Sequence, residues 1–164
     1  MLINGWTLYA HAEFLHQLEA LLVRVGQDRQ RKPDAWKTRN AYKRLAAVAR
    51  LAFRAIPSDP TGRQWQLGNT LGSEHRHWRR AKFFQQYRLF FRYNETGRVV
   101  VLAWVNDDDC LRAYGAADDA YAVFKAGLAK GRPPDDWQSL HADARDAAAR
   151  WGALKQQLDQ LQEE

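Results

Sequence analysis

The stretch WRRAKFFQQYRLFFRYNETGRVVVLAWVN, residues 78–106, decides the fold, because apolar and polar side chains alternate along it with the period of two that is typical of β-strands. It predicts three consecutive strands, over residues 77–84, 87–94 and 98–106. The last two are joined by a four-residue hairpin turn, residues 94–97, that ends in a glycine where a positive φ would be needed. The pattern therefore predicts an antiparallel meander.

The middle strand has two different faces. One face carries Arg88, Phe90 and Arg92. The other face carries Tyr87, Leu89, Phe91 and Tyr93, which a four-residue loop pairs with Trp104, Leu102, Val100 and Arg98 of the third strand. We expect this apolar face to form the core and to pack against helices.

The length of the loop at Gln85 and Gln86 decides which face the basic residues of the first strand share. A two-residue loop would set Lys82 opposite Leu89, in the core, whereas a three-residue loop would set it opposite Arg88. Burying an unpaired cation costs several kcal/mol. We therefore predict the odd offset or a bulge, which gathers basic and aromatic side chains on one surface: Arg80, Lys82, Arg88 and Arg92 with Trp78 and Phe90.

Helical periodicity flanks the sheet on both sides. Residues 11–24 and 34–56 are predicted to form two amphipathic helices. The exposed side of the second carries a basic ridge, formed by Arg39, Lys43, Arg50 and Arg54. This ridge is either a solvated helix face or an additional contact surface for a partner.

The chain turns acidic after the sheet. Residues 106–109 are expected to start a short helical stretch, and residues 118–130 a further helix that ends at Gly131. Asp135 or Asp136 then caps a final helix with a heptad stripe, which either docks along the domain or forms a partner interface. The prediction is an α+β fold, with two N-terminal helices on an antiparallel sheet in residues 1–137 and a C-terminal amphipathic helix in residues 138–164.

Length and charge narrow the function. The 164 residues suffice for one compact domain, and the formal net charge is +6. Residues 1–98 hold 18 of the 25 basic and 7 of the 19 acidic groups, a net charge of +11, whereas residues 99–164 carry a net charge of −5. A positive field attracts nucleic acids, acidic membranes or acidic proteins.

Several classes of protein are excluded by missing features. The single cysteine, Cys110, cannot form an internal disulfide or a CxxC pair. Neither a signal peptide nor an apolar run long enough to cross a bilayer is present, so we expect a cytoplasmic protein without membrane contact. Nucleotide-binding glycine loops, HExxH and GxSxG are all absent.

The basic sheet surface is the main candidate site. Cations interleaved with aromatic rings bind phosphates and stack bases, which is how single-stranded RNA is held. They also suit RNA cleavage, in which a 2′-hydroxyl attacks its own phosphate and arginine donors stabilise the dianion that develops. The predicted RNA-binding residues are Arg79, Arg92, Trp78, Phe90, His77 and Arg112.

Other readings of the residues stay open. His75 and His77 could form a general acid/base pair. Asp107, Asp108 and Asp109 could hold Mg²⁺, although adjacent carboxylates at a helix start are more often caps, and we expect no metal. The chain could also be a non-catalytic RNA- or ribosome-binding module, a corepressor, or a binder of acidic proteins.

Ordered blocks of the sequence resemble the YhaV toxin family, which belongs to the RelE-like group of toxin–antitoxin ribonucleases. The blocks are NGWTLYAH (4–11), LGS (71–73), WRRAKF (78–83), YRLFFRY (87–93), LAWVNDDDCLRAYG (102–115), DAYAVFK (119–125) and GRPPDDW (131–137). The resemblance implies a RelE-like fold and an endoribonuclease that acts on ribosome-associated mRNA. It also implies inhibition by a PrlF-type antitoxin, and association with DNA only through that antitoxin.

The resemblance further implies metal-independent chemistry at a basic cluster. By position, the catalytic residues are Arg80, Lys82, Arg88 and Tyr114, with Lys82 or Tyr114 assisting the 2′-hydroxyl. Asp107–Asp109 stand where the RelE pattern has a further arginine. The candidates for the general acid are therefore Arg92, Arg112, His75 and His77.

Overall fold

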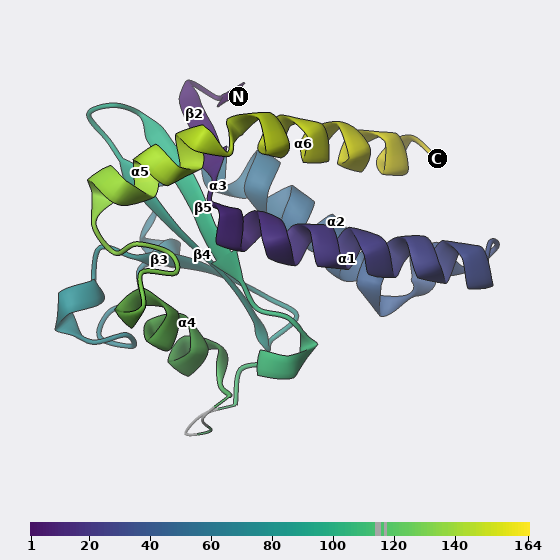
Figure 1. The fold of residues 1–164 in the computed structure, drawn as a ribbon, viewed down its shortest axis with the longest axis horizontal. Coiled ribbons are helices and arrows are strands. Elements are labelled where there is room, and N and C mark those ends of the chain that lie inside the picture. The colour runs from purple at the N-terminus through teal and green to yellow at the C-terminus, as the bar shows by residue number, and fades with distance from the viewer. Residues whose placement is uncertain (114–115, 117) are drawn as a thin grey trace.

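The computed structural model describes residues 1–113, 116 and 118–164, and its centre is a five-stranded sheet of order β1-β2-β5-β4-β3 (Figure 1). The strands are β1 (Leu2–Ile3), β2 (Trp6–Ala10), β3 (Arg79–Phe83), β4 (Tyr87–Asn94) and β5 (Val99–Val105). β3, β4 and β5 form the predicted antiparallel meander. β2 adds a strand parallel to β5, and β1 pairs with β2 in the antiparallel sense.

The register of β3 against β4 confirms the prediction of an odd offset. Phe83 pairs with Tyr87 across a three-residue connection, so Lys82 lies opposite Arg88. The connection turns through two residues with left-handed backbone, Phe84 at φ 46° and Gln85 at φ 64°. Basic side chains of both strands therefore share one side of the sheet.

The predicted register of β4 against β5 is wrong. Asn94 pairs with Val99, so the turn spans residues 95–98 and shifts the register by two residues, which sets Phe91 opposite Leu102. A bulge between Phe90 and Phe91 shifts it by one more residue, so Leu89 pairs with Val105. The bulge moves Trp104, expected in the core against the N-terminal helices, to the opposite face.

The hairpin turn between β4 and β5 also differs from the prediction. Arg98, and not Gly97, has the positive φ, at 51°. The Arg98 guanidinium donates to the Gly5 carbonyl at 3.1 Å and lies over the Trp6 ring at 4.6 Å. These contacts with the β1–β2 turn stabilise a conformation that arginine rarely adopts.

One face of the sheet is covered by α1 (Ala12–Arg31), α2 (Asn40–Arg50) and α6 (Ala148–Glu163). Residues 51–55 continue α2 as a π-helical turn into α3 (Ile56–Ser58). The two predicted N-terminal helices are therefore present, although α1 is longer than expected and the second helix begins at Asn40 and not at residue 34, after a 3₁₀ turn at Trp36–Thr38. They share the face with α6, so the N-terminal helices alone do not make this layer.

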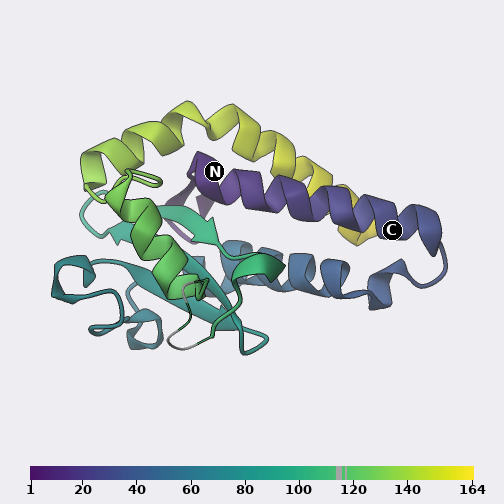
Figure 2. The ribbon, with the colours of Figure 1, turned by 60° about the horizontal axis from the view of Figure 1, so that its bottom comes forward.

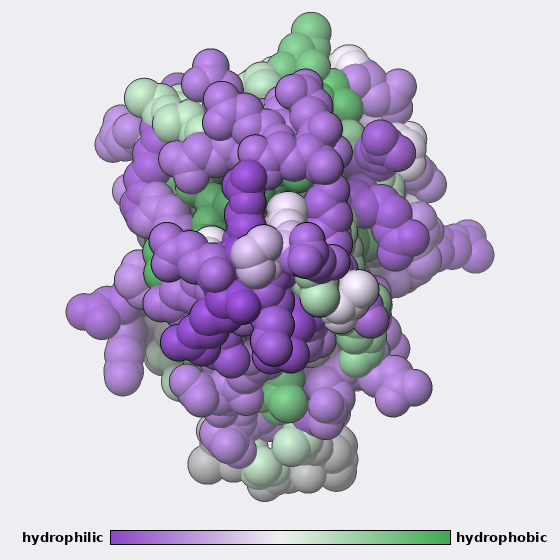
Figure 3. All heavy atoms as spheres, turned by 90° about the vertical axis from the view of Figure 1, so that its right-hand side faces the viewer, coloured by the Kyte–Doolittle hydropathy of each residue, from purple (hydrophilic) through white to green (hydrophobic). Residues whose placement is uncertain are grey.

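α6 docks along the body of the molecule, which confirms one of the two alternatives for the heptad stripe. Trp151 stacks on Phe53 with ring centroids 5.2 Å apart and meets Phe14 edge-on at 6.0 Å. Arg150 pairs with Glu19 of α1 through contacts of 2.5 and 2.8 Å. Together, α1, α2 and α6 project beyond the sheet, and their far end is mainly hydrophilic (Figures 2 and 3).

The opposite face of the sheet is also covered, by α4 (Ala120–Ala129) and α5 (Trp137–Asp146). Both predicted helices are present, and Asp119 and Asp136 each accept backbone N–H bonds in the first turn, which confirms the cap expected at Asp135 or Asp136. The predicted final helix is divided at Ala147 into α5 and α6. Where residues 106–109 were expected to start a short helical stretch, a one-turn 3₁₀ helix forms, Asp108–Cys110.

A second hydrophobic core, between the sheet and the helices α4 and α5, changes the interpretation of the basic sheet face. Phe124 of α4 stacks on Phe90 at 4.1 Å and meets Trp78 edge-on at 5.0 Å. The sheet is thus enclosed between two helical layers (Figure 1). Within the described residues, no helix is both long and apolar enough to span a membrane.

Candidate functional site

Two arginines converge on a single tyrosine hydroxyl beside the N-terminus of α4. The Tyr121 oxygen accepts hydrogen bonds from Arg80 Nε at 3.2 Å and from Arg88 Nε at 3.1 Å. Arg112 lies over the Tyr121 ring at 4.7 Å. We call these four residues, with the neighbouring Lys82, the Tyr121 cluster.

The arginines of the Tyr121 cluster are held in place by backbone carbonyls. Arg88 is buried, and its Nη1 donates to Gln85 at 2.7 Å and to Tyr87 at 2.9 Å. Arg80 Nη1 donates to the Gln66 carbonyl at 2.7 Å. Both guanidiniums are therefore fixed through Nε and Nη1, and no described residue forms a hydrogen bond with either Nη2 group.

Lys82 is the exposed member of the Tyr121 cluster. It lies directly opposite Arg88 in the ladder, where two like charges destabilise a sheet. No carboxylate of the described residues forms a salt bridge with Arg80, Lys82 or Arg88. The sheet therefore maintains a concentration of positive charge that its own acidic groups do not neutralise.

The position of Tyr121 depends on the cap of α4. Asp119 Oδ2 accepts the Tyr121 N–H at 3.1 Å, and Asp119 Oδ1 binds Arg112 at 2.5 Å and the Ala113 N–H at 2.8 Å. Burial alone would raise the pKa of Asp119, but the hydrogen bonds from Arg112 and Ala113 outweigh it and lower the pKa. One carboxylate thus fixes both Tyr121 and the arginine that covers its ring.

The aromatic half of the predicted RNA surface is wrong. Trp78 and Phe90 are both 0% exposed, because α4 packs over them. Neither ring can stack on a base in this fold. Alternation in β4 correctly predicted that these rings share a side with Arg88, but a second helical layer covers them.

Two predicted RNA-binding arginines lie apart from the Tyr121 cluster. Arg92 lies between Trp78 and Trp137, at 5.6 Å from each ring, and its Nη1 donates to the Asp135 carbonyl at 2.5 Å. Burial lowers the pKa of Arg92. Arg79 lies over the Tyr93 ring at 5.5 Å on the other side of the strand. The structure therefore does not bring Arg79 or Arg92 together with Lys82, and Tyr114 lies outside the described residues.

His77 belongs to a second group, the histidine cluster, formed with His75 and Asp135. Asp135 Oδ1 lies 3.1 Å from His75 Nδ1 and 3.0 Å from His77 Nε2, and it accepts the Trp78 indole N–H at 2.7 Å. Burial would raise the pKa of Asp135, but these bonds lower it. Burial and the charge of Arg92 lower the pKa of His77. The cluster joins the segment before β3 to the turn before α5.

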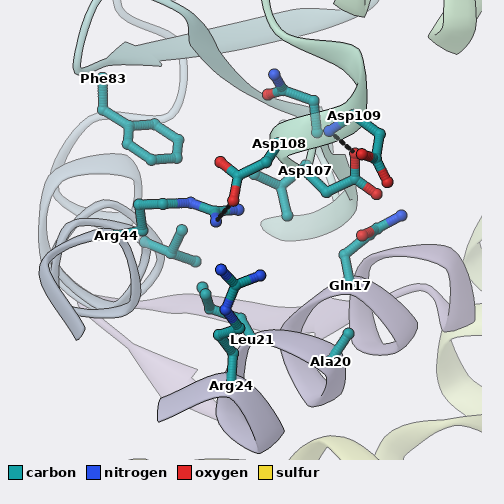
Figure 4. A pocket seen from close by; sticks show the side chains of 12 residues that line it. Gln17, Ala20, Leu21, Arg24, Arg44, Phe83, Asp107, Asp108 and Asp109 are labelled. Carbon is teal, nitrogen blue, oxygen red and sulfur yellow. Dashed lines mark hydrogen bonds and ion pairs between the residues drawn. The ribbon is translucent and has the colours of Figure 1, made fainter. Parts of the chain in front are cut away.

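The acidic run at residues 107–109 lines a cavity of about 170 Å³ between α1, α2 and the sheet (Figure 4). Asp107 accepts the Asp109 N–H at 2.9 Å, as a cap does. Asp108 binds Arg44 at 3.0 Å and accepts a hydrogen bond from the Tyr87 hydroxyl. The carboxylates of Asp107 and Asp108 therefore serve internal contacts.

The sequence carried only weak signals for Tyr121 and Asp135. Tyr121 lies in the DAYAVFK block and Asp135 in GRPPDDW, and both blocks contributed to the family resemblance without a role for either residue. Tyr121 meets Arg80 across 41 residues and Asp135 meets Trp78 across 57 residues. Contacts of that range cannot be read from local periodicity.

Comparisons with known proteins agree on one family. A family model described as "Toxin with endonuclease activity, of toxin-antitoxin system" matches residues 8–145. Toxin YhaV of Escherichia coli O6:H1 is 39% identical over 147 residues, which cover 88% of this chain and 96% of that protein. Ribonuclease toxin YhaV of Escherichia coli K12 is 38% identical over 146 residues, covering 88% and 95%. No solved structure gives a significant match. The chain belongs to the YhaV family of toxins with endonuclease activity.

Proposed function

We propose that the chain is a ribonuclease toxin that cleaves mRNA on the ribosome, through attack of a 2′-hydroxyl on the adjacent phosphate, and that a PrlF-type antitoxin inhibits it. The name of the Escherichia coli K12 relative supports RNA as the substrate. A target on the ribosome places its action in the cytoplasm. The sequence resemblance, together with helices that flank an antiparallel meander, supports a RelE-like fold.

The convergence of Arg80 and Arg88 on the Tyr121 hydroxyl is the observation that carries this proposal. The phosphorane that forms during 2′-hydroxyl attack gains negative charge on its non-bridging oxygens. Fixed guanidinium donors stabilise such charge without reorganisation during the reaction. Arg80 and Arg88 suit this requirement, since their Nε and Nη1 groups are bound within the protein and no described residue binds their Nη2 groups, which we propose donate to the phosphate.

Each member of the Tyr121 cluster has a distinct proposed role. Arg80 and Arg88 bind the scissile phosphate, and exposed Lys82 adds charge at the entrance. Tyr121 and Arg112 are positioning residues, because the phenol aligns both guanidiniums and Arg112 braces its ring. Tyr114 remains the proposed proton-transfer residue from the sequence resemblance.

Cleavage of translated mRNA by purified protein tests the proposal. We expect Arg80→Ala and Arg88→Ala each to lower kcat at least about tenfold, the loss typical of a transition-state donor. Arg145→Ala, on the exposed side of α5, is the matched control and should retain full activity. The products should carry 2′,3′-cyclic phosphate ends.

Three outcomes would contradict the proposal. Full activity in folded Arg80→Ala and Arg88→Ala proteins would remove the Tyr121 cluster from the reaction. Products with 5′-phosphate and 3′-hydroxyl ends would contradict attack by the 2′-hydroxyl. Tight, salt-dependent binding with every phosphodiester intact would instead identify a non-catalytic RNA-binding module.

A further inference from the structure

The histidine cluster has the composition of a metal site. Among the described residues, His75, His77 and Asp135 alone form a group in which potential ligand atoms of three side chains all lie within 4.8 Å of one another. The potential ligands are two imidazole nitrogens and one carboxylate oxygen. Zinc and related transition metals favour this donor set, whereas Mg²⁺ and Ca²⁺ favour oxygen ligands.

The distances within the cluster suit a cation of zinc size. Ligand atoms around a tetrahedral Zn²⁺, bound at about 2.0–2.1 Å, lie ~3.3 Å apart. Asp135 Oδ1 lies 3.1 Å from His75 Nδ1 and 3.0 Å from His77 Nε2. Separations a few tenths of an ångström larger would accommodate the ion. The His77 side chain, 35% exposed, has the freedom to make this adjustment.

Outer contacts of the cluster resemble those that support metal ligands. Ligating histidines usually donate their second ring N–H to a carboxylate, and ligating carboxylates are themselves hydrogen-bonded. His75 Nε2 lies 3.8 Å from Glu74 Oε1, and the Trp78 indole donates to Asp135 at 2.7 Å. If Nδ1 of His75 binds the ion, its proton moves to Nε2, which faces Glu74.

The two segments that carry the ligands are anchored on both sides of the site. Trp78, directly after His77, is fully buried in the second core. Asp136, directly after Asp135, caps α5 by accepting the Ser139 N–H at 2.9 Å. Arg92 binds the backbone carbonyl of Asp135 and leaves its carboxylate to the histidines. The ligands are therefore gathered before any ion arrives, which lowers the entropic cost of binding.

We infer that His75, His77 and Asp135 bind one divalent transition-metal ion, with Zn²⁺ as the preferred ion, and that this ion fastens the segment before β3 to the turn before α5. Three protein ligands leave a fourth position for water. This inference does not depend on the proposed ribonuclease function, since the site and its test concern metal binding alone.

Metal binding by the full chain, purified without an affinity tag and stripped with EDTA, tests this inference. After equilibration with Zn²⁺ and removal of free ion, mass spectrometry of the metal should give one zinc per chain. Co²⁺ should give the visible absorption of a four-coordinate site. Zn²⁺ should also raise the melting temperature, because binding to the folded state stabilises it.

Substitution of one ligand separates the site from adventitious binding. His77→Gln keeps a hydrogen-bonding side chain at a partly exposed position, and it should weaken zinc binding at least about tenfold, as loss of ligand-shell groups does. His16→Gln, at an exposed position on α1, is the matched control and should bind one zinc. Circular dichroism verifies that both variants fold.

Two results would overturn the inference. One is that the wild-type chain retains less than about one-fifth of a zinc ion per chain, which is expected if the cluster is only a hydrogen-bond network. The other is equal zinc affinity in the wild type and in folded His77→Gln, which would locate the ion elsewhere. Neither result depends on RNA cleavage, so failure here is distinguishable from failure of the proposed function.

Discussion

The Tyr121 hydroxyl is the smallest unit on which the proposed catalysis depends. Tyr121→Phe keeps the ring under Arg112 but removes the acceptor of two arginine bonds. Because the guanidiniums lose their common alignment, we expect kcat to fall about tenfold with KM changed less than about twofold, which is the pattern of an interaction specific to the transition state. Initial rates of RNA cleavage measure this.

A second tyrosine provides the control for that substitution. Tyr9→Phe removes a hydroxyl from β2 that has no hydrogen bond to the described residues, and it should leave both constants unchanged. Tyr121 would not be a positioning residue if Tyr121→Phe kept the wild-type kcat, including the case in which only KM increased.

Asp119 links the stability of the site to pH. Its pKa in the folded chain is below the ordinary value of 3.8, so the charged carboxylate stabilises the fold above that pH, and the contribution is lost as the pH falls through the folded pKa. Asp119→Asn should lower the free energy of unfolding by about 1–2 kcal/mol at pH 7, as loss of a charged cap does. The difference in the free energy of unfolding between wild type and Asp119→Asn should become smaller below about pH 4.

Urea unfolding at pH 7 and pH 3.5 measures the effect of Asp119→Asn. Asp146→Asn, at an exposed position near the end of α5, is the control and should change little at either pH. If wild type and Asp119→Asn differed in the free energy of unfolding by the same amount at both pH values, the stabilising role of the charge would be contradicted.

The sequence predicted the basic part of the Tyr121 cluster, but not its tyrosine. Arg88 and Lys82 could be set opposite each other because burying Lys82 in the core is too costly, which leaves one acceptable register. Trp78 and Phe90 were misread because alternation shows which side chains share a face, but not what covers that face. Tyr121 and Asp135 depend on long-range packing, which has no local pattern.

Among the elements, the turn between β3 and β4 sets Lys82 opposite Arg88, and it does so with a strained backbone. Gln85 has φ 64°, which is unfavourable for a side chain with a Cβ atom. Gln85→Gly should therefore raise the free energy of unfolding by about 0.5–1 kcal/mol, since glycine adopts this conformation without strain. Thermal or urea unfolding measures the gain.

The adjacent glutamine is a matched control for the turn. Gln86→Gly makes the same chemical change at a residue whose φ is not positive, and it should destabilise the chain. If both substitutions destabilise equally, the left-handed backbone of Gln85 is not a source of strain.

Helices were easier to predict than strands in this chain. The cap at Asp136 and the apolar stripes of α1, α2 and α6 are local signals, and each led to a real helix. β2 was missed because its five residues are too few for a clear period and its parallel partner, β5, is about 90 residues away. The bulge in the β4–β5 ladder likewise has no signature in the alternating pattern.

At the scale of the whole molecule, the acidic second part of the chain partly neutralises the basic first part. Asp108 binds Arg44, Asp143 binds His11, Asp135 binds both histidines of the histidine cluster, and Glu164 reaches Arg29. The cations of β3 and β4 have no such partners among the described residues. Folding therefore concentrates the excess positive charge at the Tyr121 cluster and at the exposed basic ridge of α2.

This distribution of charge makes a prediction about RNA affinity. A protein that neutralises phosphates releases counterions, and for single strands the logarithm of the binding constant falls with the logarithm of salt concentration by about 0.7 per phosphate contacted. In an Arg88→Ala background, which is expected to cut RNA at least about tenfold more slowly than wild type, Lys82→Ala should reduce that slope by about 0.7. Arg145→Ala in the same background should leave the slope unchanged. An identical slope with and without Lys82 would show that RNA does not cross the Tyr121 cluster.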